Sequence, residues 1–150
     1  ILDQVSDPHN VGAIFRAGEI FGASGIVLTG DRTAPVNATV RKVSVGASEL
    51  LEHCVVANLQ RVIKDLKQSG FWVVGADNGV NSQAIESFSF PSPLALIVGA
   101  EGSGLRQLTI KECDVLVSIT QFGKTESLNV SQATSIFLYE VRKQMVNSYC

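Results

Sequence analysis

The segment Leu94-Ala95-Leu96-Ile97-Val98-Gly99-Ala100-Glu101-Gly102-Ser103-Gly104-Leu105 joins an apolar run to a turn with three glycines. Such a segment is typical of a buried strand that leads through a loop into a helix. The glycines do not match the dinucleotide fingerprint, which needs them at positions one, three and six, because here they occupy positions one, four and six. Glu101 would also oppose a pyrophosphate at the same backbone N–H groups. The turn therefore indicates a ligand that places no phosphate there.

Apolar, β-branched runs alternate with helical periodicity on both sides of this turn. The runs predict six strands, near Ile1–Val5, Gly25–Leu28, Cys54–Ala57, Phe71–Gly75, Leu94–Val98 and Val115–Ile119. Helices are predicted near Val11–Phe21, Asn37–Leu51, Leu59–Gln68, Leu105–Glu112 and Leu128–Gln144. The segment Asn78–Pro93 is predicted to be a loop with one helical turn at Gln83–Glu86. This alternation predicts an α/β domain with a mostly parallel six-stranded sheet flanked by helices.

Length and charge bound the class of protein. The 150 residues fit a single domain, residues 1–150, which is long enough to bury about two thirds of its unfolded surface. Twelve basic and 14 acidic residues give a net charge of −2, so the chain as a whole creates no field that attracts nucleic acid. With 45% hydrophobic and 17% charged residues, the chain is apolar enough to favour a partner subunit that covers part of its surface.

The cysteines and the hydropathy favour a reducing cytoplasm. Cys54, Cys113 and Cys150 form no CxxC pair and have no His at metal-ligand spacing, so we expect reduced thiols, buried or terminal, and no metal site. No stretch approaches 18 uninterrupted apolar residues, so no membrane span is expected.

Two further polar turns accompany the glycine-rich one. Asp7-Pro8-His9-Asn10-Val11-Gly12 opens the first predicted helix, and Ser127-Leu128-Asn129-Val130-Ser131 opens the last. Ser and Asn are common helix caps, because their oxygens accept hydrogen bonds from unpaired backbone N–H groups. A cap needs one such residue, whereas the second motif has three. The three turns together therefore predict one composite site.

A nucleoside ligand without a phosphate, such as S-adenosylmethionine, satisfies these turns. Its adenine needs backbone partners and apolar walls, its ribose needs an acceptor, and its sulfonium is cationic. Backbone at Gly99, Ile119 and Leu128 could form the walls. The alternative, in which the glycines only make a tight strand-to-helix turn, stays open.

The last predicted helix is apolar on more than one face. One stripe consists of Val130, Ala133, Phe137 and Val141, and the residues Ile136, Leu138 and Tyr139 lie outside it. A helix with two apolar faces needs two sets of neighbours, which predicts a place at a dimer interface.

The three turns together resemble the motifs of the TrmH (SpoU) branch of the SPOUT methyltransferases, which methylate ribose 2′-hydroxyls in RNA. The resemblance spans about Leu2 to Lys143, with the motifs in the same order, and includes Arg16 after the first. The segments Asp31–Ala34, Asn37–Thr39, Lys42–Val43 and Gly46–Glu49 are most similar to the bacterial RlmB type, which methylates a guanosine of large-subunit ribosomal RNA. Related members act on tRNA.

The resemblance implies S-adenosylmethionine as cofactor, RNA as substrate, and a homodimer with its active site near the subunit boundary. It implies a deep C-terminal trefoil knot, in which the segments around Gly99–Gly104 and Ile119–Ser131 wrap the cofactor. It also implies a small N-terminal RNA-binding domain outside this chain, which would explain a start at Ile1, within a predicted strand and without an initiator Met.

Carried over position by position, the resemblance assigns roles to particular residues. Its catalytic positions fall on Asn10, Arg16, Glu101, Ser127 and Asn129, and its cofactor-binding positions on Gly99, Glu101, Gly104, Ile119 and Leu128. Arg16 is the residue to which the family assigns activation of the hydroxyl. A guanidinium with a pKa above about 12 stays protonated at pH 7, which favours stabilisation of the developing alkoxide, or a clamp on the adjacent phosphate, over general base catalysis. From the sequence alone, a surface pair with Glu19 is the competing explanation.

One segment departs from the family pattern. Thr120-Gln121-Phe122 stands where relatives commonly have Pro-Met or Pro-Leu and a small residue before the glycine. Without Pro we expect a less constrained loop on the adenine side, and cofactor affinity is the property that this departure concerns. Two other functions are considered: a knotted RNA-binding protein without catalysis, and an α/β domain that binds a small molecule or nucleotide. The intact motif residues disfavour the first, and the glycine spacing disfavours a dinucleotide binder.

Overall fold

A computed structural model describes residues 1–147 of the chain. Within them the strands are β1 (Leu2–Asp3), β2 (Ile26–Thr29), β3 (His53–Val56), β4 (Trp72–Ala76), β5 (Gln83–Ala84), β6 (Leu94–Gly99) and β7 (Val115–Ser118). The helices are α1 (Pro8–Ile20), α2 (Ala38–Ser44), α3 (Ala47–Leu50), α4 (Leu59–Gln68), α5 (Gln107–Glu112) and α6 (Val130–Asn147), and η1 is a 3-10 turn at Ile85–Ser87. The α/β class is confirmed.

The strands form one sheet in the order β3-β2-β1-β6-β4-β7-β5, and every pairing is parallel. The chain builds β1, β2 and β3 outward, and then crosses to the other half of the sheet. There β6 inserts between β1 and β4, so Asp3 lies opposite Gly99. Parallel strands end on the same edge, so the loops after β1, β4, β6 and β7 meet. This edge is where the polar turns come together.

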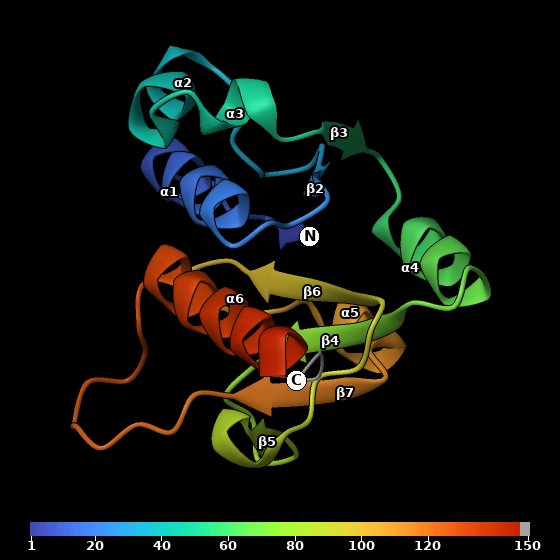
Figure 1. The fold of residues 1–150 in the computed structure, drawn as a ribbon. Helices are drawn as coiled ribbons and strands as arrows, with labels where there is room; N and C mark the ends of the chain where they lie inside the picture. The colour runs from blue at the N-terminus through green and yellow to red at the C-terminus, as the bar shows by residue number, and fades with distance from the viewer. Residues whose placement is uncertain (148–150) are drawn as a thin grey trace.

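Helices cover both faces of the sheet (Figure 1). On one face α1 packs against α2, α3 and α6, and α6 also packs against β6. On the other face α4 and α5 pack against each other and against β4. The helix α6 is thus the element that connects the two halves of the sheet.

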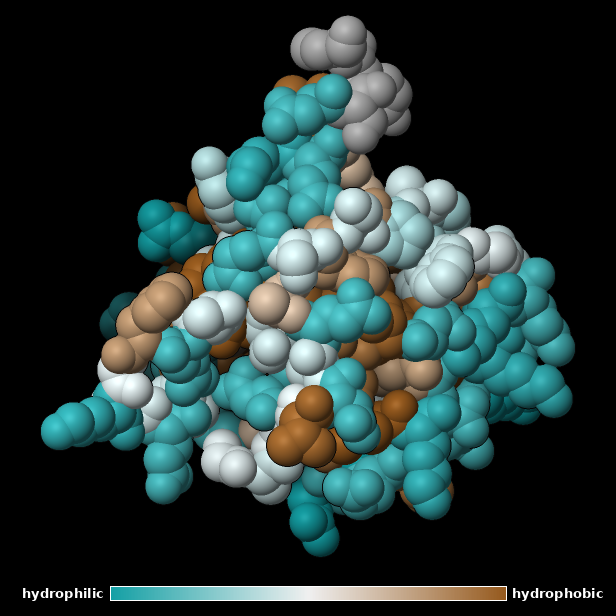
Figure 2. Space-filling view, turned by 90° about the horizontal axis from the view of Figure 1, so that it is seen from below, coloured by the Kyte–Doolittle hydropathy of each residue, from teal (hydrophilic) through white to brown (hydrophobic). Residues whose placement is uncertain are grey.

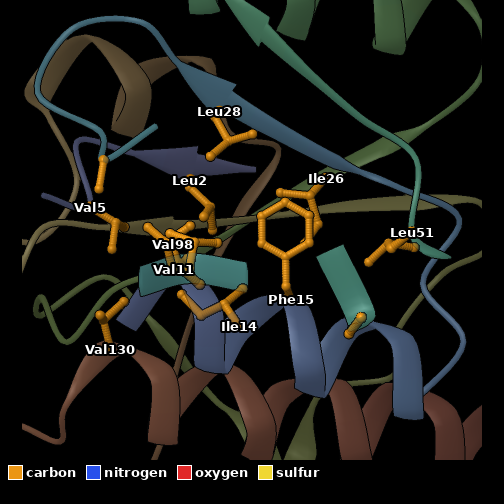
Figure 3. Packing of buried hydrophobic residues seen from close by; sticks show 13 residues of the cluster. Leu2, Val5, Val11, Ile14, Phe15, Ile26, Leu28, Leu51, Val98 and Val130 are labelled. Atoms are coloured by element: carbon orange, nitrogen blue, oxygen red, sulfur yellow. The ribbon is translucent and has the colours of Figure 1, made fainter. Parts of the chain in front are cut away.

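The core follows the two-residue period of the strands. In β4, Val73 packs with Leu59 and Ile63 of α4, whereas the next residue, Val74, packs with Phe137 of α6. The largest buried cluster lies between the sheet and α1 (Figure 3). Its labelled members include Leu2, Val11, Ile14, Phe15, Ile26, Leu28 and Val98. Strands buried on both faces explain the continuous apolar runs in the sequence.

The sheet has seven strands, so the prediction of six was wrong. The missed strand, β5, lies where the sequence predicted a loop with one helical turn at Gln83–Glu86. The turn exists one to two residues later, as η1. A strand of two residues is too short to show a period, and β5 forms because Gln83 and Ala84 pair with the edge of β7.

The predicted helix Asn37–Leu51 is two helices. The first, α2, begins after Asn37, whose side chain accepts a hydrogen bond from the Val40 N–H at 3.1 Å. It ends at Val45 and Gly46, which have φ values of 52° and 86°. Glycine adopts such angles at little cost, which ends α2 and starts α3. Because the apolar periodicity of the sequence continues through Val45 and Gly46, it does not reveal the boundary between α2 and α3.

Three other helices begin at residues that differ from the prediction. The helix α1 begins at Pro8, because Asp7 caps it by accepting from the His9 N–H at 2.8 Å. The helices α5 and α6 begin two residues after their predicted starts. As a result Leu128 and Asn129 belong to the loop that precedes α6.

The cysteines match the prediction only in part. Cys54 and Cys113 are free thiols, and Cys150 lies outside the described residues. Cys54 is exposed, contrary to the expectation of a buried or terminal position, because it lies on the edge strand β3. Cys113 is partly buried.

Apolar side chains also reach the surface. Figure 2 shows hydrophobic residues interspersed among hydrophilic ones on the face seen from below. On α1 and α6 the exposed apolar residues are Ile20, Ile136, Tyr139 and Val146. None of the described helices combines the length and the apolar character that crossing a membrane requires.

Candidate functional site

Three of the predicted site residues form one hydrogen-bonded group. Asn10 Nδ2 donates to Glu101 Oε1 at 2.9 Å, and Asn129 Nδ2 donates to the same oxygen at 2.7 Å. Asn129 Nδ2 also lies 3.0 Å from Asn10 Oδ1. We call Asn10, Glu101 and Asn129 the amide–carboxylate group. It joins one residue from each of the three polar turns, so the structure brings these turns together as the sequence predicted.

Each member of this group is held by its own element. Asn10 lies in the first turn of α1 and is 6% exposed. Asn129 caps α6, because its Oδ1 accepts from the Ser131 N–H at 2.8 Å and from the Ser131 hydroxyl at 2.6 Å. The cap and the site are therefore the same side chain, whose oxygen serves the helix while its amide nitrogen serves Glu101.

The glycine-rich turn presents Glu101 to the two amides. Ala100 and Gly104 exchange backbone hydrogen bonds of 3.1 and 2.9 Å, which closes the turn around Glu101. A side chain at Gly99 would overlap the Gly104 carbonyl group, and Gly104 itself has a φ of 65°. Glycine at these two positions is therefore required by close approach and by backbone angle, whatever the turn binds.

A buried polar cluster fixes the far end of this turn. Asp3, paired with Gly99 across the sheet, has a fully buried side chain. Its Oδ1 lies 2.6 Å from Arg106 Nη2, and its Oδ2 accepts from the Thr109 hydroxyl at 2.7 Å. Arg106 directly follows the turn and precedes α5. No local pattern in the sequence reveals this cluster, because Asp3 lies more than 100 residues from both Arg106 and Thr109.

The turn forms one wall of a pocket of about 410 Å³. All predicted cofactor-binding residues line it, namely Gly99, Glu101, Gly104, Ile119 and Leu128, and Ser127 does so as well. The structure thus brings together segments around residues 77, 100, 120 and 128 at the carboxyl edge of the sheet. A second, larger cavity of about 770 Å³ lies near the amino ends of β1, β2 and β6 and contains none of the predicted site residues.

Arg16 stands apart from the amide–carboxylate group. Six residues separate it from Asn10, which places it about 9 Å further along α1 and about a third of a turn around the axis. Its side chain is exposed, and within residues 1–147 it forms no hydrogen bond or ion pair. The surface pair with Glu19 is therefore not formed, and Arg16 is not brought into the pocket of its own chain.

Residues after β4 line the pocket although the sequence analysis had not selected them. Asp77, Asn78 and Gly79 follow the carboxyl end of β4 directly. Asp77 Oδ2 accepts from the Gly79 N–H at 2.9 Å, which makes a tight turn. The signal that could have found Asp77 is its place at the end of a strand next to the glycine-rich one, where parallel sheets bind ligands.

The loop that lacks the family's Pro is tied down by side chains. The Thr120 hydroxyl donates to Glu86 Oε2 at 2.8 Å. The amide oxygen of Gln121 is oriented to accept from Asn78 Nδ2 at 3.0 Å. Its amide nitrogen donates to the carbonyl oxygens of Thr125 and Glu126, both at 3.2 Å. The side-chain hydrogen bonds of Thr120 and Gln121 thus restrict the conformation of the loop. A Pro would have restricted it through its fixed backbone angle.

Comparisons with known proteins give a consistent result. A model of the SpoU rRNA Methylase family matches residues 1–139. The 23S rRNA (guanosine-2′-O-)-methyltransferase RlmB of Ralstonia nicotianae is 43% identical over 144 residues, which are 96% of this chain and 57% of that protein. An uncharacterised tRNA/rRNA methyltransferase of Synechocystis sp. is 46% identical over 144 residues, 96% of this chain and 37% of that protein. The chain thus spans roughly a third to three fifths of the length of these relatives.

Solved structures share the fold. The SpoU methyltransferase AviRb of Streptomyces viridochromogenes, determined in complex with AdoMet, superposes with a TM-score of 0.89 at 27% identity, over 97% of this chain and 59% of that one. The TrmH/SpoU tRNA modifying enzyme of A. aeolicus superposes with a TM-score of 0.90 at 26% identity, over 99% and 75% of the two chains.

Proposed function

The chain belongs to the SpoU rRNA methylase family, and on that premise we propose that it transfers a methyl group from S-adenosylmethionine to a ribose 2′-hydroxyl of RNA. The substrate we infer is a guanosine of large-subunit ribosomal RNA, and we place the reaction in the cytoplasm. The observation that carries this proposal is the amide–carboxylate group at the rim of the 410 Å³ pocket. Relatives at 41–43% identity are named as enzymes for that reaction, which supports the choice of substrate.

The pocket fits the proposed cofactor on chemical grounds. Ile119 and Leu128 offer apolar walls for an adenine, and the closed turn at Gly99–Gly104 offers backbone groups. Among the described residues, no Lys, Arg or His lines the pocket, so a phosphate would find no cation there. Asp77, Glu101 and Glu126 line it instead, which suits a ligand with a positive charge.

When bound, S-adenosylmethionine supplies an electrophilic methyl group. The ribose oxygen forms a bond to the methyl carbon as the carbon–sulfur bond breaks, and the hydroxyl proton leaves to solvent. The amide–carboxylate group holds the glycine-rich turn against the start of α6, which keeps the two walls of the pocket in register. Ser127, exposed at the rim, is placed to contact the incoming nucleotide.

Arg16 acts on the substrate as a cation at the surface in this proposal. The exposed guanidinium stabilises charge that develops on the ribose oxygen, or holds the adjacent phosphate, without giving up a proton. Ile20, four residues further along the same exposed face of α1, is 62% exposed. A second subunit that covers Ile20 would also approach Arg16, so we propose that the active unit is a homodimer in which Arg16 serves the partner subunit's pocket.

The decisive experiment is methylation of ribosomal RNA and tRNA in parallel by the full-length protein with labelled S-adenosylmethionine, followed by mapping of the 2′-O-methyl position. We expect label on a guanosine of the large-subunit RNA. Label on tRNA alone would replace the substrate assignment, and absence of cofactor binding by the folded protein would end the enzyme proposal.

Arg16→Ala tests the role of the guanidinium in the same assay. We expect a methyl-transfer rate at least about tenfold lower, with RNA binding reduced if Arg16 holds the phosphate and unchanged if it acts only on the alkoxide. Because Arg16 has no partner among the described residues, the free energy of unfolding should change by less than about 0.5 kcal/mol. A rate equal to wild type would remove Arg16 from the mechanism.

Two further parts of the proposal concern architecture. A trefoil knot at the C-terminal end is supported by the way residues 119–128 line the same pocket as the turn at 99–104. Pulling the chain from both ends should then leave a contour shorter than that of a fully extended chain. An N-terminal RNA-binding domain is supported by the net charge of −2, which leaves wider RNA attraction to another part of the protein.

A further inference from the structure

The ionisable side chains that line the proposed cofactor pocket all carry negative charge. Its three ionisable side chains, Asp77, Glu101 and Glu126, are all carboxylates. The cation Lys67 lies outside the pocket, since it pairs at 2.9 Å with Asp114, whose carboxylate accepts from the Val73 N–H near the amino end of β4. Glu101 Oε1 is occupied by the amides of Asn10 and Asn129. These amides are neutral and leave the charge of Glu101 in place, but they hold its Oε1, whereas the carboxylates of Asp77 and Glu126 keep oxygens that accept from no side chain of the described residues.

Asp77 is placed to act on the contents of the pocket. Its Oδ2 accepts from the Gly79 N–H, and its Oδ1 accepts no hydrogen bond from any described residue. That free oxygen faces the glycine-rich turn, since it lies 3.6 Å from where a Cβ on Gly104 would stand. The Asp77 backbone is fixed as well, because its N–H donates to the Val117 carbonyl oxygen at 3.1 Å. The carboxylate is thus held on a short turn between two strand ends.

Methyl transfer changes the charge of the cofactor. S-Adenosylmethionine carries a sulfonium, and its demethylated product, S-adenosylhomocysteine, has a neutral thioether in the same place. Most of the pocket, including its apolar walls and backbone groups, would contact both molecules alike. Fixed negative charge in the pocket distinguishes the two molecules, because it attracts the positively charged sulfonium and does not attract the neutral thioether.

We propose that Asp77, assisted by Glu126, makes the pocket select the cationic methyl donor over its neutral product. The inference rests on the proposed function and adds to it a specificity-determining residue. Turnover then loosens the product without any movement of the chain, because the attraction from the two carboxylates ends when the carbon–sulfur bond breaks. The same carboxylates disfavour nucleotides that carry phosphates.

The test compares the affinities of three ligands by calorimetry: S-adenosylmethionine, S-adenosylhomocysteine, and sinefungin, whose amine is cationic where the sulfonium would be. For Asp77→Asn we expect Kd for the two cationic ligands to rise about fivefold to tenfold, and Kd for S-adenosylhomocysteine to stay within about twofold. Glu126→Gln should act in the same direction with a smaller effect. Asp77→Glu, which keeps the charge, should restore the preference for the cations.

Asp65→Asn is the matched control, since Asp65 is an exposed carboxylate on α4 outside the pocket. It should leave all three affinities unchanged. Should Asp77→Asn fail to fold, the unaltered protein still tests the proposal. Raising the salt concentration should then weaken the binding of the two cationic ligands more than the binding of S-adenosylhomocysteine. Equal weakening of the three ligands in Asp77→Asn, or no weakening, would overturn the proposal. Failure of the unaltered protein to bind any of them would instead overturn the proposed function.

Discussion

Asn129 combines two tasks in one side chain. Its oxygen caps α6 by accepting from Ser131, and its amide nitrogen donates to Glu101. An aspartate has the same shape and keeps the capping oxygen, but it has no amide N–H. The two tasks can therefore be separated by replacing one amide NH2 group with an oxygen.

Asn129→Asp should damage the site while it keeps the cap. It places a second carboxylate where the amide lay 2.7 Å from Glu101, so we expect about 1–3 kcal/mol of lost stability at pH 8. Repulsion raises the pKa of the pair in the folded protein above its unfolded value. The loss should therefore shrink as the pH falls from 8 to 5, which urea unfolding at several pH values would measure.

Asn129→Ala is the matched control, because it removes the cap and the amide together. Its stability loss, about 1 kcal/mol or more, should not depend on pH over that range. A pH-independent loss in Asn129→Asp, equal to that of Asn129→Ala, would show that repulsion with Glu101 does not act.

Cys113 offers a second prediction at the residue scale. Burial is the largest cause that raises its pKa to about 12, from an ordinary value near 9. The folded thiol stays protonated where the unfolded one ionises, so its contribution to stability is complete below pH 9 and declines as the pH rises toward 12. At pH 8 an alkylating agent should label the exposed Cys54 well before Cys113, as peptide mass spectrometry would show. Equal labelling in the native protein would contradict the burial of Cys113.

The residues of the site were predictable to the extent that they lie in local motifs. Asn10, Glu101 and Asn129 each belong to a polar turn visible in the sequence, and the structure joins all three. Asp3 and Asp77 were missed because single acidic residues at strand ends are common. Their importance comes from neighbours that only the parallel register supplies, such as Gly99 opposite Asp3.

At the scale of elements, the break between α2 and α3 contains local strain. Val45 has a φ of 52°, an angle that costs a β-branched residue about 1 kcal/mol or more. Its side chain is 71% exposed, so little packing compensates in the single chain. Asparagine adopts this angle more readily.

Val45→Asn should therefore raise the free energy of unfolding by about 0.5–1 kcal/mol in thermal or urea unfolding. Val80→Asn is the control, because Val80 is fully exposed and lacks the left-handed angle. It should leave stability nearly unchanged. If both variants behave alike, strain at Val45 is not the reason for any gain.

Elements with a strong period were predictable, and short ones were not. The helix α4 was predicted with the bounds Leu59–Gln68 that the structure has, because its apolar residues recur at helical spacing and Gly70 follows it. The strand β5 depends on pairing with β7, and the break at Gly46 depends on backbone angle. Neither strand pairing nor a backbone angle changes the hydropathy pattern of the sequence, so neither feature was predicted.

At the scale of the whole molecule, the second apolar face of α6 is only partly covered, by an edge-to-face contact between Tyr139 and Phe21. Ile136 and Tyr139 are 40% and 56% exposed and lie three residues apart on that helix. The sequence predicted this surplus of apolar surface, and the described chain covers only part of it. A second copy of the chain is the partner that the proposed function requires.

Ile136→Glu should weaken that association. A carboxylate in an apolar interface loses water without gaining a partner, so we expect the dimer dissociation constant to rise at least about tenfold in analytical ultracentrifugation. Val80→Glu, in the exposed loop between β4 and β5, serves as the control for added charge. A dimer unaffected by Ile136→Glu would place the interface elsewhere on the protein.

The order of the sheet has a consequence for biosynthesis. Asn10 is made early, Glu101 much later and Asn129 near the start of the last helix, yet all three share one set of hydrogen bonds. A nascent chain on the ribosome can complete β1 to β3, one half of the sheet, first, whereas β6 must later pair with β1. No nascent chain that still holds residue 129 inside the exit tunnel can contain this site, so the amide–carboxylate group forms only after Asn129 has left the ribosome.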